Sequence, residues 1–301
     1  MKQANTSLIV ICVVSSLSGL AIAQQNWPPS PVATFKDGVY SVPDEKGKVV
    51  AAYDQGATRD LCLDAEAGNW TDAQGNSNPD WEIQNGVIRR LDGNKDLFLK
   101  GGYTDFVLDF EFKVSFAGNS GVFFHSWNEG DKARGHEYQI IDDLNRPIHP
   151  KLPRYFTGSF YSLFHRYDAA GPIIHLGYNK GRIMVMGNHV ELWLNDKLAV
   201  NVKAESPLWK CLVHNSRHQE DKRFGHLNGG KIALQNHDYE VWFRNVKLTV
   251  LSKKDALSAS LHNPFTGGGV DCRSILQPTK WRATDASEDE REGRRSAAKT
   301  G

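Results

Sequence analysis

Apolar and polar residues alternate along Asp105–Val114 (DFVLDFEFKV), and this pattern is typical of a β-strand. Every second residue from Phe106 to Val114 is apolar, whereas most of the residues between them are charged. Because successive side chains of a strand point to opposite faces of a sheet, one face is predicted to lie in the core. The other face is predicted to contact solvent or a partner.

Short segments of the same kind recur along the chain, separated by residues that favour tight turns. Asn85-Gly86 predicts a hairpin within residues 81–88, because this pair readily adopts the positive φ angles of a two-residue turn. Residues 182–202 predict three strands, with turns at Gly187-Asn188 and Asn195-Asp196. Helical periodicity is nearly absent. The sequence therefore predicts an all-β sandwich or jelly roll with few or no long helices.

The last predicted strand, Glu240–Val250, changes its apolar phase by one residue at Arg244-Asn245. A β-bulge at this point would place both halves of the strand correctly in one sheet. Bulges often redirect side chains beside active sites. Arg244 is therefore a candidate for the functional site.

Residues 1–23 have the features of a signal peptide. They contain one lysine near the start, an apolar run over residues 8–22, and Ala21-Ile22-Ala23, the small-x-small pattern of a cleavage site. An uncleaved membrane anchor is the alternative, but serines and a glycine interrupt the run, which is short for a bilayer. The sequence predicts a secreted or periplasmic protein that is cleaved after Ala23.

Composition divides the rest of the chain into three parts. Residues 24–46 are rich in proline and are predicted to be an extended lead-in. Residues 47–252 carry the strand patterns and form the predicted folded domain. Residues 253–301 contain glycines and mixed charges, and they are predicted to be a largely disordered C-terminal extension.

Charge and cysteine content narrow the functional classes. The 36 basic and 35 acidic residues leave a net charge of +1, so no global field favours nucleic acid or an anionic membrane. After signal cleavage Cys62, Cys211 and Cys272 remain, which allows at most one disulfide and leaves the pair undetermined. Separate thiols are the alternative. The cysteine spacing does not predict a metal site.

Polar side chains occur inside two predicted strands of the segment Asn119–Asp143. Counting by twos places His125 and Trp127 on the same face as Phe123, and places Glu137 together with Gln139. An imidazole, a carboxylate and an amide are thus offered by strands rather than by loop tips. This arrangement predicts a pocket that is lined by these polar side chains.

Five motifs give the chain a resemblance to a known family over roughly residues 49–251. That family was first catalogued as domain of unknown function 1080 and is now described as 3-keto-disaccharide hydrolases, or 3-keto-glucoside 1,2-lyase/3-keto-2-hydroxy-glucal hydratases. The motifs are, in chain order, NSGVFF (119–124), EYQIIDD (137–143), TGSFY (157–161), GNHVELWLND (187–196) and KIALQNHDYEVWFRNVKL (231–248).

The resemblance implies a concanavalin A-like jelly roll that acts on an oligosaccharide or glycoside already oxidised at C3. A ketone at C3 makes the C2 proton acidic, so a base can remove this proton and the C1 substituent leaves by β-elimination. Water then adds across the resulting glucal. A divalent metal cation is an expected cofactor, because it can hold the keto and enolate oxygens.

The chain departs from the usual family pattern at three places. His125 stands where the family commonly has arginine, and Gly135-His136-Glu137 stands where it commonly has glycine, tyrosine and glutamate. Tyr178-Asn179 replaces a tryptophan followed by asparagine. These differences predict altered substrate contacts.

Glu137, His237 and His125 are the candidate catalytic residues. Glu137 lies inside a strand and is expected to act as the base or as a metal ligand, with a solvated or ion-paired edge carboxylate as the alternative. His237 falls within the LQxH part of the last motif and can accept a proton near neutral pH. A structural role in a turn is its alternative.

The candidate substrate-binding residues are Asn119, Trp127, Gln139, Gln235 and Arg244, and the candidate metal ligands are Glu137, Asp142 and His237. An indole such as that of Trp127 offers a flat surface for a sugar ring, although core filling would explain it as well. A turn cap explains Asp142, and pairing with an acidic neighbour is the common role of an arginine such as Arg244.

The predicted function is a secreted enzyme that cleaves 3-keto-glycosides by elimination and hydration. No dinucleotide fingerprint or nucleophile elbow occurs, which disfavours hydride transfer by this chain. The alternative is a non-catalytic, lectin-like carbohydrate-binding module, because the same architecture serves both functions.

Overall fold

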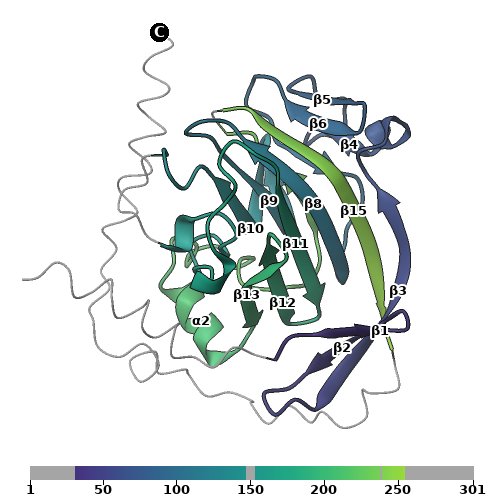
Figure 1. The fold of residues 1–301 in the computed structure, drawn as a ribbon, viewed down its shortest axis with the longest axis vertical. Coiled ribbons are helices and arrows are strands. Elements are labelled where there is room, and N and C mark those ends of the chain that lie inside the picture. Colours follow the sequence, from purple (N-terminus) through teal and green to yellow (C-terminus); the bar gives the residue numbers. More distant parts are fainter. Residues whose placement is uncertain (1–30, 147–152, 238, 255–301) are drawn as a thin grey trace, which may run out of the picture. The chain divides into compact units, whose positions relative to one another are not determined.

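The computed structural model describes residues 31–146, 153–237 and 239–254 of the chain (Figure 1). These residues belong to one compact unit that spans residues 29–270. The predicted signal peptide and nearly all of the predicted C-terminal extension lie outside the described residues. No helix among the described residues is long and apolar enough to cross a membrane.

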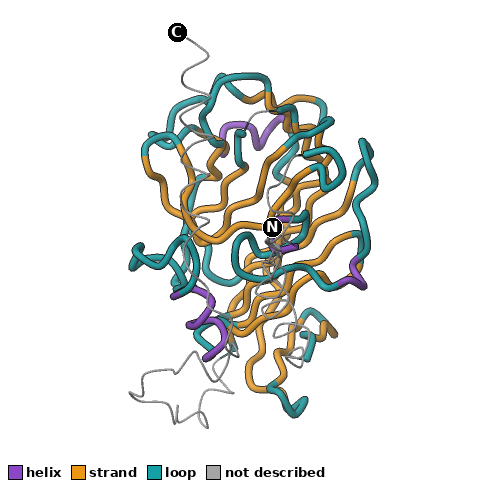
Figure 2. The backbone as a smooth tube through the Cα atoms, turned by 90° about the vertical axis from the view of Figure 1, so that its left-hand side faces the viewer, coloured by secondary structure: helices purple, strands orange, loops and turns teal. Residues whose placement is uncertain are grey.

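The described residues form two antiparallel sheets, and the strands dominate the chain trace in Figure 2. In spatial order, the larger sheet contains β1 (Thr34–Lys36), β2 (Val39–Pro43), β3 (Val49–Asp60), β15 (Val241–Lys253), β8 (Phe106–Val114), β11 (Asn179–Met186), β12 (His189–Leu194) and β13 (Lys197–Lys203). The hairpin of β5 (Trp81–Gln84) and β6 (Val87–Arg90) joins this sheet through β15.

The smaller sheet contains, in spatial order, β10 (Lys132–Ile141), β9 (Asn119–Glu129), β14 (Lys231–Leu234), β7 (Leu97–Leu99) and β4 (Trp70–Thr71). Neighbours in this order come from distant parts of the sequence, because β14 inserts between β9 and β7. The two sheets confirm the predicted jelly-roll β-sandwich.

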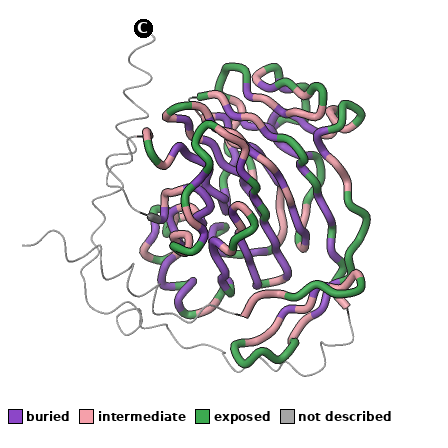
Figure 3. Tube along the Cα trace, in the orientation of Figure 1, coloured by how far each residue is buried: buried purple, intermediate pink, exposed green. Residues whose placement is uncertain are grey.

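Aromatic side chains fill the space between the two sheets. The ring of Tyr138 on β10 meets the ring of Phe110 on β8 edge-on, with centroids 5.3 Å apart. The Tyr138 hydroxyl donates to the Trp193 carbonyl on β12 at 3.0 Å, which satisfies the one polar atom of a fully buried side chain. Each such burial contributes about 2 kcal/mol. Figure 3 shows that buried residues concentrate along these strands.

The turn chemistry predicted from the sequence is confirmed. Asn85 and Gly86 have φ angles of 54° and 75° in the hairpin of β5 and β6, and Asn195 and Asp196 have φ angles of 50° and 63° between β12 and β13. The predicted bulge in β15 is also present, because its pairing with β8 shifts after Arg244.

The sheet begins earlier than the predicted domain boundary at residue 47. Strands β1 and β2 pair with each other and then with β3. Tyr40 and Val42 on β2 pack in one cluster with Tyr53 on β3 and with Met184 and Met186 on β11. The prolines of the predicted lead-in hid the alternation of apolar residues along β2.

Among the described residues α2 (Pro207–His214) is the sole α-helix, and the sequence pattern did not predict it. Ser206 caps its N-terminus by accepting from Trp209 N at 3.2 Å, and Pro207 occupies the first turn, as helix starts favour. The helix is short and its segment lacks clear periodicity. Short 3₁₀ turns occur as η1 (Asp64–Asn69), η2 (Pro153–Tyr155) and η3 (Asp168–Ala170).

The structure excludes every disulfide pair that contains Cys62. Cys62 is a buried free thiol, and burial raises the pKa of this thiol to about 11. Cys211, on α2, is disulfide-bonded. The pair Cys62 and Cys211 is therefore ruled out.

Candidate functional site

One face of the smaller sheet gathers four of the predicted site residues. Gly121 on β9 pairs with Gln139 on β10, and the next position on the same face joins Phe123 to Glu137. Beyond the end of β14, Gln235 N donates to Gly121 O at 2.9 Å, so Gln235 continues the ladder beside Gly121. Asn119, two residues before Gly121, shares this face as well. We call the surface formed by Asn119, Gly121, Glu137, Gln139 and Gln235 the polar face.

Gly121 provides the space that the Glu137 side chain occupies. A Cβ atom at residue 121 would lie 2.9 Å from both Cγ and Cδ of Glu137 and would collide with its carboxylate. The Glu137 side chain therefore lies directly over the backbone of the neighbouring strand. A glycine inside a strand often marks such a close approach.

The Gly121→Ala variant is expected to displace the Glu137 carboxylate and to reduce turnover about 100-fold, because small misplacements of a reacting group cost roughly this much. The fold should persist, since the group that must move is the end of a flexible side chain. Turnover and thermal unfolding measure the two effects. Gly68→Ala is the matched control, because an added Cβ meets nothing within 4 Å there. Wild-type turnover in Gly121→Ala would contradict the geometry.

Glu137 is 5% exposed, and within the described residues its carboxylate has no hydrogen-bond or ion-pair partner. Burial raises the pKa of Glu137 to about 8, and Arg217 is the strongest opposing charge. Asp96 reinforces the rise in pKa, whereas Arg134 opposes it. A carboxyl group with a pKa near neutral pH can both accept and release a proton, as general acid–base catalysis requires.

Two amide oxygens of the polar face are buried without a hydrogen-bond donor. They are Oδ1 of Asn119 and Oε1 of Gln235. Buried acceptors are nearly always satisfied, so such atoms are suited to receive donors from a ligand. Hydroxyl groups of a sugar are donors of this kind. Gln139 differs, because its Oε1 accepts from Ile140 N at 2.9 Å.

The segment Thr157–Tyr161 extends the polar face beyond β10. Gln139 N donates to Ser159 O at 3.2 Å, and Tyr161 N donates to Glu137 O at 3.0 Å. The Tyr161 hydroxyl accepts from Nη1 of Arg217 at 3.1 Å. Tyr161 lies in the TGSFY motif, but neither Tyr161 nor Arg217 was predicted from the sequence as a site residue.

A buried ionic network lies behind the loop that follows β14. Asp96 is 1% exposed and accepts from Ala133 N at 2.7 Å and from Asn236 N at 2.8 Å. Nζ of Lys132 lies 3.3 Å from the Asp96 carboxylate and donates to Asn236 O at 2.6 Å. This network fixes the backbone between Gln235 and His237. His237 is half-buried, and it has an interaction partner of its own.

His125 does not lie on the polar face, and the face predicted for it by counting in twos is wrong. His136 pairs with Phe124 whereas Arg134 pairs with Trp127, so two residues of β9 face Gly135 alone. This bulge turns His125 to a φ of 45° and directs its ring into the interior. There Nε2 lies 2.7 Å from Thr104 O, and the side chain is 3% exposed.

The same bulge removes Trp127 from the predicted face. Ala133 belongs to one cluster of buried apolar residues with Phe123, so the two side chains lie on the same side of the small sheet. The partner of Ala133 on β9 is Asn128 rather than Trp127. Trp127 therefore points to the opposite side, where the guanidinium of Arg223 lies 4.4 Å from its ring centroid. Simple alternation failed because a bulge adds one residue to the count.

Arg244 belongs to the other sheet and is not a neighbour of Glu137. Its Nε lies 2.7 Å from Oε2 of Glu111 on β8, and its guanidinium stacks 3.8 Å from the ring centroid of Tyr178. Glu111 lies on the face of β8 opposite the core residues. Ion pairing with an acidic neighbour, the alternative role of Arg244, is the one the structure supports.

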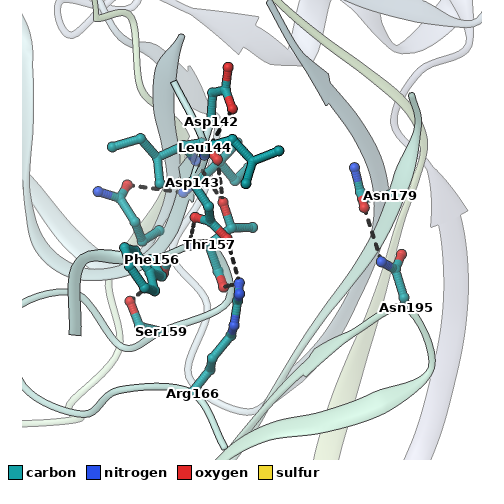
Figure 4. Close-up of polar contacts among 12 residues, drawn as sticks. Asp142, Asp143, Leu144, Phe156, Thr157, Ser159, Arg166, Asn179 and Asn195 are labelled. Atoms are coloured by element: carbon teal, nitrogen blue, oxygen red, sulfur yellow. Dashed lines mark hydrogen bonds and ion pairs between the residues drawn. The ribbon is translucent and has the colours of Figure 1, made fainter. Parts of the chain in front are cut away.

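Asp142 caps a turn, as Figure 4 shows. Its Oδ1 accepts from Leu144 N at 3.1 Å, and its Oδ2 accepts from Ala117 N and from Nδ2 of Asn145, both at 2.9 Å. Its neighbour Asp143 pairs with Arg166, whose Nη1 lies 2.7 Å away. These contacts occupy the oxygens that a metal ion would need.

The predicted metal set of Glu137, Asp142 and His237 therefore does not fit a divalent cation. Within residues 31–146, 153–237 and 239–254, no three histidine, cysteine, aspartate or glutamate side chains form a group that could hold one. Zinc sites generally take at least three protein ligands. Accordingly, none of the chemistry below is assigned to a metal.

Comparison with known proteins gives one family match and several relatives. Residues 60–249 match the family described as 3-keto-alpha-glucoside-1,2-lyase-like domain. A 3-keto-disaccharide hydrolase from Bacteroides thetaiotaomicron is 29% identical over 206 residues, which are 57% of this chain and 70% of that protein.

Two solved structures from Parabacteroides distasonis share the fold, and both proteins are named provisionally as glycosyl hydrolases. The first has a TM-score of 0.53 and 23% identity, and the match covers 61% of this chain and 89% of that chain. The second has a TM-score of 0.50 and 23% identity, with coverage of 64% and 98%.

Proposed function

Because the chain belongs to the family of 3-keto-alpha-glucoside-1,2-lyase-like domains, we propose that it cleaves 3-keto-glycosides by elimination and hydration. The family and the curated relative indicate a hydrolase that acts on carbohydrate. The observation that supports the finer proposal is the buried Glu137 carboxyl, with a pKa raised to about 8, on a face that also presents unsatisfied amide oxygens.

In the proposed reaction the ionised carboxylate of Glu137 takes the proton from C2 of the 3-keto sugar. The electron pair of that C–H bond is delocalised onto the C3 oxygen as an enolate. It then forms the C1–C2 double bond while the bond between C1 and its substituent breaks, and the substituent leaves with a proton. Water adds back, with hydroxyl at C1 and hydrogen at C2, so that the sum is a hydrolysis.

The other residues of the polar face are proposed to orient the sugar. Oδ1 of Asn119 and Oε1 of Gln235 would accept hydrogen bonds from its hydroxyl groups, which fixes the ring relative to Glu137. His237, two residues beyond Gln235, is proposed as a second proton-transfer group. His125 has no part in this scheme, because it is buried on the other side of the sheet.

The test is to incubate the purified protein with a 3-keto-glucoside in deuterated water, beside the matching unoxidised glucoside. We expect cleavage of the oxidised substrate alone, with deuterium at C2 of the product, because a proton removed from C2 is replaced from solvent. NMR of the product measures this directly. Cleavage without deuterium at C2 would contradict the elimination mechanism.

Two further measurements distinguish an enzyme from a binding module and test the need for a metal ion. Binding of unoxidised sugar without any turnover would support the lectin-like module instead of an enzyme. Turnover before and after chelator treatment, with readdition of divalent cations, tests whether the activity needs the cation that the family resemblance led us to expect.

A further inference from the structure

We propose that Arg217, held in place by Tyr161, is a positioning residue that keeps the buried carboxyl of Glu137 able to release its proton near neutral pH. This inference rests on the proposed role of Glu137 as the base, and it adds a residue that no sequence motif indicated. Arg217 acts through Glu137 rather than on the substrate.

The backbone places Tyr161 directly beside Glu137. Phe160 forms a bridge with Tyr138, and Tyr161 N donates to Glu137 O at 3.0 Å. Two residues that lie directly opposite each other on antiparallel segments share a face of the sheet. The Tyr161 side chain therefore lies on the same side of the sheet as the Glu137 side chain. The Tyr161 hydroxyl accepts a hydrogen bond from Nη1 of Arg217 at 3.1 Å. A permanently charged group is thereby held at the rim of the polar face.

The segment that carries Arg217 is fixed on both sides. Ser216, just before it, donates its hydroxyl to Val213 O at the end of α2 at 2.8 Å. His218, just after it, stacks on Phe224 with ring centroids 4.0 Å apart. Arg217 is therefore presented by an ordered turn, although its own side chain is exposed.

The charges around Glu137 come from several elements, and Arg217 has the largest effect among them. Burial raises the pKa of Glu137, Arg217 lowers it most, Asp96 raises it, and Arg134 lowers it less. Asp96 is paired with Lys132, and Arg134 is paired with Glu129.

The residues beside Arg217 and Glu137 do not replace the charge of Arg217. Burial lowers the pKa of His218 to about 4, so this ring is neutral at pH 7. The facing positions of β9, Gly121 and Phe123, carry no charge.

The Arg217→Gln variant tests the inference, because it removes the charge and keeps a hydrogen-bonding side chain. We expect the titration midpoint of Glu137 to rise by about one pH unit, which is typical of losing a nearby opposite charge. The acid limb of the kcat/KM profile should move by the same amount, with kcat/KM roughly tenfold lower at pH 6 and only about twofold lower at pH 9.

Carbon-13 NMR of glutamate-labelled protein measures the midpoint without any substrate, and Glu137→Gln assigns the signal. Arg217→Lys keeps the positive charge, so the titration midpoint of Glu137 should stay close to its wild-type value. Tyr161→Phe removes the hydroxyl that accepts from Arg217, and it should raise the Glu137 midpoint less than Arg217→Gln does. Arg223→Gln is the matched control, because Arg223 is exposed in the same segment, pairs with Asp221 and should not affect Glu137.

An unchanged midpoint in Arg217→Gln overturns the inference, whatever happens to activity. Lower turnover with an unchanged midpoint would assign Arg217 to substrate contact instead. A raised midpoint in a protein whose wild type cleaves no 3-keto-glycoside would support the role of Arg217 and contradict the proposed function. The two claims therefore fail separately.

Discussion

Replacing Glu137 by glutamine is expected to lower kcat by about 10³-fold while the protein stays folded. Removal of a positioned general base typically costs between 10² and 10⁴ in rate. Glutamine keeps the shape that fits over Gly121 but cannot take a proton from carbon. Initial rates with a 3-keto-glucoside, beside circular dichroism of the variant, measure both parts of this prediction.

The same variant is expected to be more stable than the wild type in alkaline solution. Burial raises the pKa of Glu137 from 4.5 to about 8, so the folded protein retains a proton that the unfolded chain releases. Stability therefore falls as pH rises through this window, by about 1.4 kcal/mol per unit. Glutamine does not titrate, and at pH 8 we expect it to unfold with a free energy about 4 kcal/mol higher.

Glu129→Gln provides the control, because Glu129 lies on the neighbouring strand but its side chain is 64% exposed. It should change neither turnover nor the dependence of stability on pH. If Glu137→Gln retained wild-type turnover, the proposed base would be wrong. Lost activity together with lower stability at pH 8 would indicate a structural carboxylate rather than a functional one, since functional groups are often held at a cost in stability.

His136→Leu is expected to make the protein much less sensitive to acid. His136 is fully buried against Phe124, Phe160, Trp209 and Phe224, with centroid distances of 5.0 to 5.9 Å. Neither ring nitrogen has a hydrogen-bond partner, although the nearby backbone of Phe124 weakly favours the charged ring. Burial lowers the pKa of His136 from 6.5 to about 3.

A histidine with a lowered pKa binds fewer protons in the folded state than in the unfolded chain. Its contribution to stability is complete above pH 6.5 and is lost as pH falls toward 3. At pH 4 the wild type should have lost about 3 kcal/mol through this residue, and His136→Leu should not show that loss. Urea unfolding at several pH values measures the difference between the two proteins.

The matched control is His226→Gln, because the His226 side chain is 55% exposed. This variant should follow the wild-type pH dependence. Parallel curves for His136→Leu and the wild type between pH 6.5 and pH 4 would contradict the buried neutral histidine.

Glu137 and His136 together predict an optimum of stability where their two pH windows overlap, between about pH 4.5 and pH 6.5. The pKa of Glu137 is raised, so its contribution weakens as pH rises, and the pKa of His136 is lowered, so its contribution weakens as pH falls. Both effects arise from burial at adjacent positions of β10, on opposite faces of one strand.

Local patterns were sufficient for most of the fold. The alternation in residues 106–114 determined which side of β8 would enter the core, and Asn85-Gly86 determined a hairpin, because both depend on neighbours in the chain. The phase change at Arg244 likewise indicated the bulge of β15. For Glu137 and Gln139, an undisturbed count by twos along one strand was enough to place them on one face.

Other features depended on contacts between distant segments. The bulge opposite Gly135 reversed the face of Trp127 and buried His125, since an inserted residue shifts every later side chain and leaves no clear trace in composition. Tyr161 and Arg217 come near Glu137 only because their two segments, distant in the sequence, pack at the edge of β10. The sequence by itself determined the β-strands and the polar residues they carry. The tertiary structure decided which of those residues share one environment, because burial and charge act through space and not along the chain.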